Sequence, residues 1–253
     1  MSQPEIHHFP APDGIQLAYR ELGAPEARPV LLIHGLFSDG LVNWVNYGTA
    51  AKLVAAGFRC IIPDLRAHGA SDKPHDAAAY PPEVLVQDQF ALLTHLGIDD
   101  YDLVGYSLGA RTAAAMLVQG ARPRKAILAG MGLGGLTNTA PRRDHFHHVL
   151  RNLGTHERGS PAFMAEAFLK TTGGDPLALD LVLDTFRDVP ETALRTIETP
   201  IAILCGADDN DNGSADDLAA LLPHGTRLTV PGNHMSCVTL PAFGTAICDY
   251  LRS

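Results

Sequence analysis

Residues 102–119, Asp-Leu-Val-Gly-Tyr-Ser-Leu-Gly-Ala-Arg-Thr-Ala-Ala-Ala-Met-Leu-Val-Gln, decide the fold that this sequence predicts. A short apolar run meets Gly105-Tyr106-Ser107-Leu108-Gly109, and an alanine-rich, helix-favouring segment follows. Glycines two residues before and two residues after a serine permit a sharp strand-to-helix turn, in which a Cβ at either position would collide with backbone. Such a turn exposes the Ser107 hydroxyl at a helix N-terminus, which favours negative charge. We interpret Ser107 as a nucleophile; a plain Gly/Ser turn is the alternative.

The rest of the chain alternates between apolar, strand-like runs and helix-like segments. We expect further strands at 6–9, 15–19, 30–33, 59–63, 125–129, 201–205 and 225–230, and further helices at 44–56, 82–96 and 243–251. Pro12-Asp13-Gly14 between the first two strands predicts an antiparallel hairpin. The later alternation predicts right-handed crossovers and a mostly parallel sheet, and therefore an α/β protein.

One long segment breaks this alternation. Residues 132–198 are helix-like, hold no clear buried strand and begin with a glycine-rich stretch. We expect residues 1–131 and 199–253 to form the α/β core and residues 132–198 to form a helical cap inserted between two core strands. Six apolar cap residues are candidates to line a pocket: Phe146, Leu150, Phe163, Met164, Phe168 and Leu169.

Composition and charge exclude several classes of protein. The formal charge of -9 disfavours nucleic acid and anionic membrane as partners, because both require basic patches. No apolar run approaches the ~18 residues of a membrane span, and the N-terminus lacks the pattern of a signal peptide. The four scattered cysteines are expected to be buried free thiols, and a cytoplasmic location follows as the default. His145 and His148 lack a third well-spaced ligand, so we expect neither a metal nor another cofactor.

A serine nucleophile needs a base, an orienting acid and donors for the developing oxyanion. His234 is the candidate base, because it follows the last strand near the end of the chain. The segment after the strand at 201–205 offers Asp208, Asp209 and Asp211 as the acid. The order Ser, Asp, His along the chain is one known arrangement of such a triad. The oxyanion donors would be the backbone amides of Leu36 and Leu108.

Together these features resemble the α/β-hydrolase fold along essentially the whole chain. The matching pieces are His34-Gly35 after a strand, the stretch from Asp64 to Ser71, the Ser107 turn, the aspartate after a strand and the late histidine. In that family the acid usually stands three residues after the glycine that ends the strand, which implies Asp209. Ala67 and Ala110 stand where the family often has glycine, and both are small-for-small departures.

The resemblance implies a serine hydrolase that cleaves a small to medium carboxylic ester through an acyl-enzyme. Carbon–carbon bond hydrolysis of a ring-cleavage product, lactone hydrolysis and perhydrolysis are the enzymatic alternatives. A ligand-sensing relative that presents a small molecule to a protein partner is the alternative from another class. The expected partner is a small ester or a related carbonyl compound, and the sequence leaves the oligomeric state open.

Overall fold

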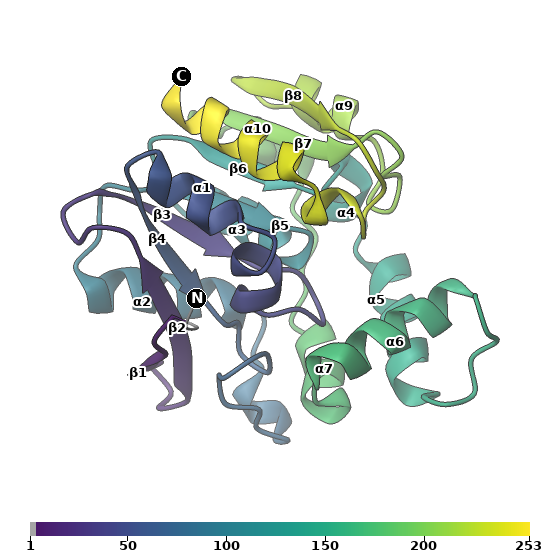
Figure 1. The fold of residues 1–253 in the computed structure, drawn as a ribbon. Coiled ribbons are helices and arrows are strands. Elements are labelled where there is room, and N and C mark those ends of the chain that lie inside the picture. The colour runs from purple at the N-terminus through teal and green to yellow at the C-terminus, as the bar shows by residue number, and fades with distance from the viewer. Residues whose placement is uncertain (1–3) are drawn as a thin grey trace.

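An eight-stranded sheet organises the chain, which a computed structural model describes over residues 4–253. The strand order is β1-β2-β4-β3-β5-β6-β7-β8 (Figure 1). β1 pairs with β2, and β2 with β4, in antiparallel fashion, and all the other neighbouring pairs are parallel. The strands are β1 (His7–Pro10), β2 (Gln16–Leu22), β3 (Arg28–Ile33), β4 (Phe58–Pro63), β5 (Asp102–Tyr106), β6 (Ala126–Ala129), β7 (Ile201–Gly206) and β8 (Gly225–Val230). This sheet confirms the predicted hairpin and the predicted α/β class.

Both faces of the central strands are buried, as their continuous apolar sequences require. In β3, Leu31 and Ile33 pack into the larger apolar cluster, whereas Val30 and Leu32 pack into the cluster on the opposite face. This alternation follows from the two-residue period of a strand.

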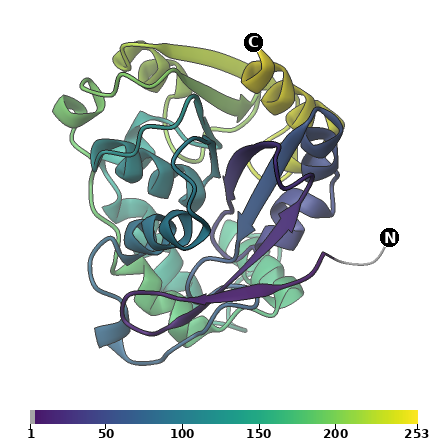
Figure 2. The same ribbon diagram turned by 90° about the vertical axis from the view of Figure 1, so that its left-hand side faces the viewer.

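Helices cover the two faces of the sheet (Figures 1 and 2). α1 (Thr49–Ala55) and α10 (Pro241–Arg252) lie side by side on one face. α2 (Val84–Leu96), α3 (Leu108–Val118) and α9 (Ala215–Leu221) supply apolar residues to the cluster on the other face. Two short 3-10 turns, η2 (Ala77–Ala79) and η3 (Cys237–Thr239), lie in connections.

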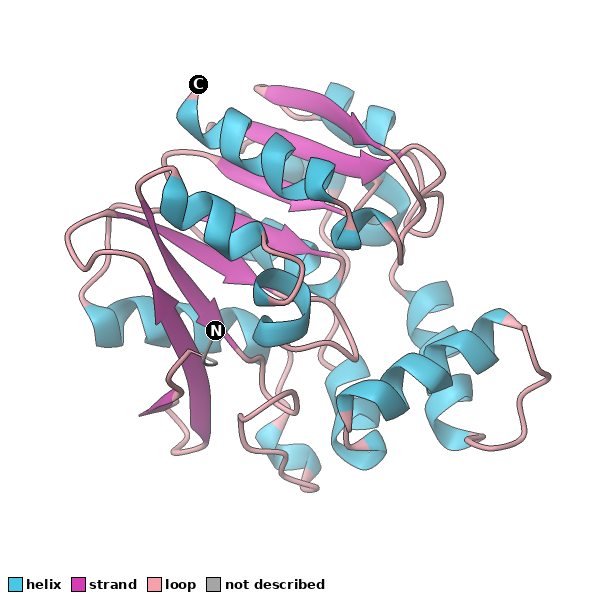
Figure 3. Cartoon of the chain, in the orientation of Figure 1, coloured by secondary structure: helices cyan, strands magenta, loops and turns pink. Residues whose placement is uncertain are grey.

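Five helices lie between β6 and β7, in the segment predicted to be a cap. They are α4 (Leu133–Thr137), α5 (Ala140–Arg151), α6 (Pro161–Thr172), α7 (Pro176–Leu183) and α8 (Glu191–Leu194). α5 packs against both α6 and α7, and the three helices project beyond the sheet (Figures 1 and 3). The Ser160 and Asp175 side chains cap the N-termini of α6 and α7, where a proline follows at the first helical position.

The structure corrects one predicted helix and adds a helix that was not predicted. The helix predicted over residues 44–56 is divided into a π-helical turn, η1 (Leu41–Val45), and α1. Gly48 separates them, because its left-handed backbone, with φ at 82°, cannot continue a helix. α9, which connects β7 to β8, was not predicted. Within residues 4–253, every helix is too short or too polar to cross a bilayer.

Candidate active site

The turn after β5 places Ser107 in a strained backbone conformation. Ser107 has φ 54° and ψ -111°, directly between the end of β5 and the start of α3. A Cβ on Gly105 would lie 2.2 Å from the Gly109 carbonyl oxygen, and a Cβ on Gly109 would lie 2.1 Å from that of Ile33. Both flanking glycines are therefore required sterically. The turn fixes the Ser107 hydroxyl above the carboxyl edge of the sheet at a cost of about 1–3 kcal/mol in backbone strain.

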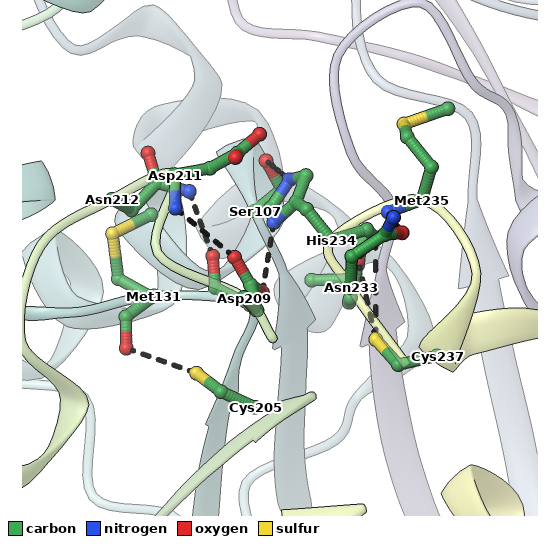
Figure 4. Close-up of polar contacts among 12 residues, drawn as sticks. Ser107, Met131, Cys205, Asp209, Asp211, Asn212, Asn233, His234, Met235 and Cys237 are labelled. Atoms are coloured by element: carbon green, nitrogen blue, oxygen red, sulfur yellow. Dashed lines mark hydrogen bonds and ion pairs between the residues drawn. The ribbon is translucent and has the colours of Figure 1, made fainter. Parts of the chain in front are cut away.

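Ser107, His234 and Asp209 form a chain of hydrogen bonds (Figure 4). His234 Nε2 lies 3.1 Å from Ser107 Oγ, and His234 Nδ1 lies 3.0 Å from Asp209 Oδ2. The His234 and Asp209 side chains are 8% and 2% exposed, so water hardly competes for this contact. Of the other two candidate acids, Asp208 is exposed, and Asp211 forms an ion pair with Arg142.

The surroundings of Asp209 favour its ionised form. Burial raises the pKa of the Asp209 carboxyl, but the hydrogen bond and charge of His234 oppose burial and leave this pKa below its ordinary value. The Asp211 backbone N–H also donates to Asp209 Oδ1 at 3.2 Å. An ionised carboxylate accepts the Nδ1 proton of His234, which leaves Nε2 free to accept the proton of Ser107.

Tyr106 holds the backbone of His234, a contact that the sequence did not indicate. The two rings stack with centroids 5.3 Å apart, and the Tyr106 hydroxyl donates to the His234 carbonyl oxygen. This hydroxyl also lies 3.7 Å from Cys237 Sγ. Burial raises the pKa of Tyr106 well above its ordinary range, so the phenol stays protonated and remains a donor.

The two backbone amides predicted as oxyanion donors belong to different segments of the chain. Leu108 is the first residue of α3, where a backbone N–H has no acceptor within the helix. Leu36 lies in the turn after β3 and lines the same cavity as Ser107. The Leu108 residue itself lines a second, smaller cavity on the other side of α3.

A buried polar network supports the turn that carries Leu36. His34 is fully buried; its Nδ1–H donates to the Gly35 carbonyl oxygen, and its Nε2 accepts the Leu65 N–H at 2.9 Å. The Asn43 side-chain oxygen, Oδ1, accepts the Gly35 N–H at 3.1 Å. His34 therefore braces the loop and is not part of the cavity lining.

A cavity of about 520 Å³ lies over Ser107 and His234, a size typical of small-molecule sites. Of the six cap residues predicted as lining, Phe146, Met164 and Phe168 reach it. The prediction was wrong for Leu150 and Leu169, because these side chains are buried in the packing between the helices of the cap segment. Phe163 is also absent from the lining, since it projects from another side of α6.

The cavity also has a polar rim that the sequence did not predict. The Arg142 guanidinium pairs with Asp211 at 3.1 Å and lies 4.8 Å from the centre of the Phe146 ring. His145 lines the same side. The Thr172 hydroxyl of α6 donates to the Phe37 carbonyl oxygen at 2.7 Å and so ties the inserted helices to the turn after β3. Trp44 is buried against Phe243 and is not part of the lining.

Comparison with known proteins agrees with this architecture. Residues 28–148 match the family model described as alpha/beta hydrolase fold. An epoxide hydrolase of Caballeronia sordidicola is 40% identical over 103 residues, which are 41% of this chain and 30% of that protein. A 2-hydroxymuconate semialdehyde hydrolase of Pseudomonas sp. (strain CF600) is 32% identical over 130 residues, 51% of this chain and 44% of that protein. The chain thus spans less than half the length of these curated relatives.

A solved structure covers the whole chain. The crystal structure of a hydrolase from Pseudomonas aeruginosa PA01 superposes with a TM-score of 0.81 at 24% identity, over 100% of both chains. The sheet order, the serine turn and these matches define an α/β-hydrolase fold. Residues 28–148 resemble the α/β hydrolases in sequence, and the whole chain shares their fold.

Proposed function

We propose that this protein is a serine hydrolase that cleaves a small to medium carboxylic ester. His234 takes the Ser107 proton as the Ser107 oxygen attacks the ester carbonyl carbon. The amides of Leu36 and Leu108 stabilise the oxyanion of the tetrahedral intermediate. His234 then gives the proton to the departing alcohol, which leaves Ser107 acylated.

Water completes the cycle by the reverse sequence of proton transfers. His234 accepts a proton from a water molecule as the water oxygen attacks the acyl carbon, and returns it to Ser107 when the acid departs. Asp209 stabilises the charged imidazolium in both halves of the reaction. The inserted helices, residues 132–198, act as a cap that excludes bulk water from the cavity.

The observation that carries this proposal is the hydrogen-bond chain from Ser107 through His234 to Asp209 at 3.1 and 3.0 Å. A serine alone is a poor nucleophile at neutral pH, and the buried chain supplies the base and the orienting acid that it needs. One compared relative is named an epoxide hydrolase. The serine at position 107 argues against epoxide hydrolysis here, because in this fold epoxide hydrolysis is associated with a carboxylate nucleophile.

Hydrolysis of a carbon–carbon bond is the second candidate. A compared relative, 32% identical, is named 2-hydroxymuconate semialdehyde hydrolase. Asn43 Nδ2 is buried without a hydrogen-bond partner within residues 4–253, and Asn43 lines the cavity. Such a donor could hold a second substrate oxygen of a diketone-type compound. A ligand sensor with the same fold would bind a carbonyl compound and show at most a single slow turnover.

The test is a series of p-nitrophenyl esters of increasing acyl length, from acetate upward, on the wild type and Ser107→Ala side by side. We expect sustained turnover that peaks at short acyl chains and is lost in the variant. Full turnover by Ser107→Ala would disprove the assignment of the nucleophile. A stoichiometric burst without turnover would favour the sensor. A dienoic ring-cleavage product is assayed in parallel, and turnover of this compound without turnover of any ester would favour carbon–carbon bond hydrolysis.

A further inference from the structure

A second cavity lies beside α3, the helix that directly follows Ser107. It measures about 30 Å³, which exceeds the ~10–15 Å³ that one water needs. Residues from α2, from α3 and from the segment after α7 form its wall. Its lining combines the polar residues Glu83, Arg111, Thr112, Thr185 and Arg187 with five apolar residues, Leu85, Val86, Leu108, Ala115 and Phe186. The cavity is therefore small and separate from the site over Ser107, and its mainly apolar wall carries three charged side chains.

Arg111 is the unusual member of this lining. Its side chain belongs to the first turns of α3, and its backbone N–H donates to the Ser107 carbonyl oxygen at 3.0 Å. The residue is only 6% exposed, and its Nη1 atom has no hydrogen-bond partner within residues 4–253. Burial lowers the pKa of the Arg111 guanidinium to about 10, so it is still charged at neutral pH.

Within residues 4–253 two other arginines are buried, and both have a carboxylate partner in direct contact, which Arg111 lacks. Arg20 donates to both carboxylate oxygens of Asp64, at 3.0 and 2.9 Å. Arg66 donates to Asp88 and Asp13 and to a backbone carbonyl oxygen. Each of these guanidinium groups is thus neutralised by a carboxylate in direct contact, as a buried charge requires.

The groups around Arg111 compensate its charge only in part. The Arg111 guanidinium lies 4.9 Å from the centre of the Phe186 ring, which supplies a cation–π contact. Asp188 acts on it only at a distance, and the Asp188 carboxylate accepts the Thr139 N–H at 2.8 Å instead. Glu83 accepts a hydrogen bond from Gln119 at 2.8 Å. The Thr112 and Thr185 hydroxyls donate to backbone carbonyl oxygens, so their donors are already used.

We propose that this cavity is a binding site for a small monovalent anion, of the size of chloride or formate, which contacts the Arg111 guanidinium. The anion supplies the counter-charge that no neighbouring carboxylate supplies in direct contact. Arg187, at the exposed edge of the cavity, adds a second positive charge. Because the site lies within one helical turn of Ser107, the bound anion stabilises the start of α3. This proposal does not depend on the reaction catalysed at Ser107.

The experiment measures thermal unfolding at constant ionic strength while sodium chloride or sodium formate replaces sodium gluconate. Gluconate is too large for the cavity and serves as the non-binding anion. A ligand that binds only the folded state raises Tm by about 3–6 °C at roughly ten times its dissociation constant, for a chain of this size. We expect saturable stabilisation by chloride and formate.

Two variants locate the effect. Arg111→Met, which keeps the bulk of the side chain, should abolish the chloride-dependent rise in Tm. Arg124→Met is the matched control: Arg124 is exposed, pairs with Asp100 and lies outside the cavity lining, so its variant should keep the full rise. An equal rise in Arg111→Met, or no saturable rise in the wild type, overturns the proposal.

A crystallographic measurement keeps the proposal testable if Arg111→Met fails to fold. Wild-type crystals soaked in sodium bromide should show an anomalous difference peak within hydrogen-bond distance of the Arg111 guanidinium. Water in the cavity without bromide would overturn the proposal. A bromide peak that competing chloride removes would support it.

Discussion

At the scale of single residues, two neighbouring aspartates after β7 have different surroundings. Asp209 contacts His234 Nδ1 at 3.0 Å with a side chain that is 2% exposed. Asp208 is exposed, and its backbone N–H donates to the Gly232 carbonyl oxygen. The pair therefore gives a matched test of the proposed acid, because the two side chains are identical and adjacent.

We expect Asp209→Asn to lower kcat for a p-nitrophenyl ester by about 10⁴-fold, because an amide does not fix the tautomer of His234 that accepts the serine proton. Asp208→Asn should stay within about twofold of the wild type. Steady-state kinetics on both variants, after circular dichroism has shown that they are folded, is the measurement. Equal losses in the two variants would contradict the assignment of Asp209.

At the scale of elements, α6 presents different faces to the cavity and to its other surroundings. Phe168 lines the cavity, and Phe163, on the same helix, does not. Five positions apart, the two side chains project about 140° apart around a helix of 3.6 residues per turn. Periodicity alone did not show which of them faces Ser107.

Truncating the cavity-lining phenylalanine should change acyl-chain preference. We expect Phe168→Ala to shift the optimum of the ester series toward longer acyl chains, because it removes most of an aromatic ring from the wall of the cavity. Phe163→Ala should leave the optimum where it is in the wild type. The ratio of kcat/KM between a long and a short ester is the measurement, and identical ratios in both variants would show that α6 does not shape the acyl site.

The glycines of α3 and α4 provide a second test at this scale. Gly109→Ala places a Cβ 2.1 Å from the Ile33 carbonyl oxygen, so β3 and α3 would have to separate. Gly134 in α4 has its nearest neighbour at 3.7 Å, an ordinary contact. We expect Gly109→Ala to lower Tm strongly, whereas Gly134→Ala should raise the free energy of unfolding by up to about 1 kcal/mol. Thermal unfolding of both variants checks this, and a neutral Gly109→Ala would be inconsistent with the tight turn.

At the scale of the whole molecule, two buried histidines make stability depend on pH. The rings of His34 and His68 lie 5.0 Å apart, and the residues are 0% and 2% exposed. Burial lowers the pKa of His34 below its ordinary value, and burial, with the nearby His34, lowers the pKa of His68 to about 3. Below pH 6.5 the unfolded chain therefore binds protons that the folded chain does not.

It follows that the free energy of unfolding should fall as the pH decreases from 6.5 to about 5. The stabilisation that comes from keeping these histidines neutral is complete above their pKa in the unfolded chain. Below that pKa, each such histidine lowers the free energy of unfolding by about 1.4 kcal/mol per pH unit. His68→Gln should reduce the slope of the free energy of unfolding against pH by the amount that corresponds to about one proton. His8→Gln, at an exposed position, should not change this slope. Urea unfolding across this range is the measurement. A pH-independent midpoint in the wild type would refute the linkage.

The sequence by itself determined the features that depend on local geometry and chain order. Glycine spacing around Ser107 predicted the turn, because steric exclusion by a Cβ acts on immediate neighbours. Apolar runs predicted the strands, and strand-helix alternation predicted the parallel sheet. The late histidine was identifiable because parallel strands bring their carboxyl ends to one edge. Where a special backbone angle intervened, as at Gly48, the predicted helix was wrong.

Only the tertiary structure decided which side chains meet. His234 is 127 residues from Ser107 and 25 from Asp209, so its contacts depend on how β5, β7 and the last loop pack. The same holds for Tyr106 beneath His234 and for the unpaired Arg111. The direction of a side chain follows from the packing of whole elements, and a linear pattern records only which face is apolar. The residues that we propose to react could therefore be named from the sequence, whereas the shape of the cavities could not.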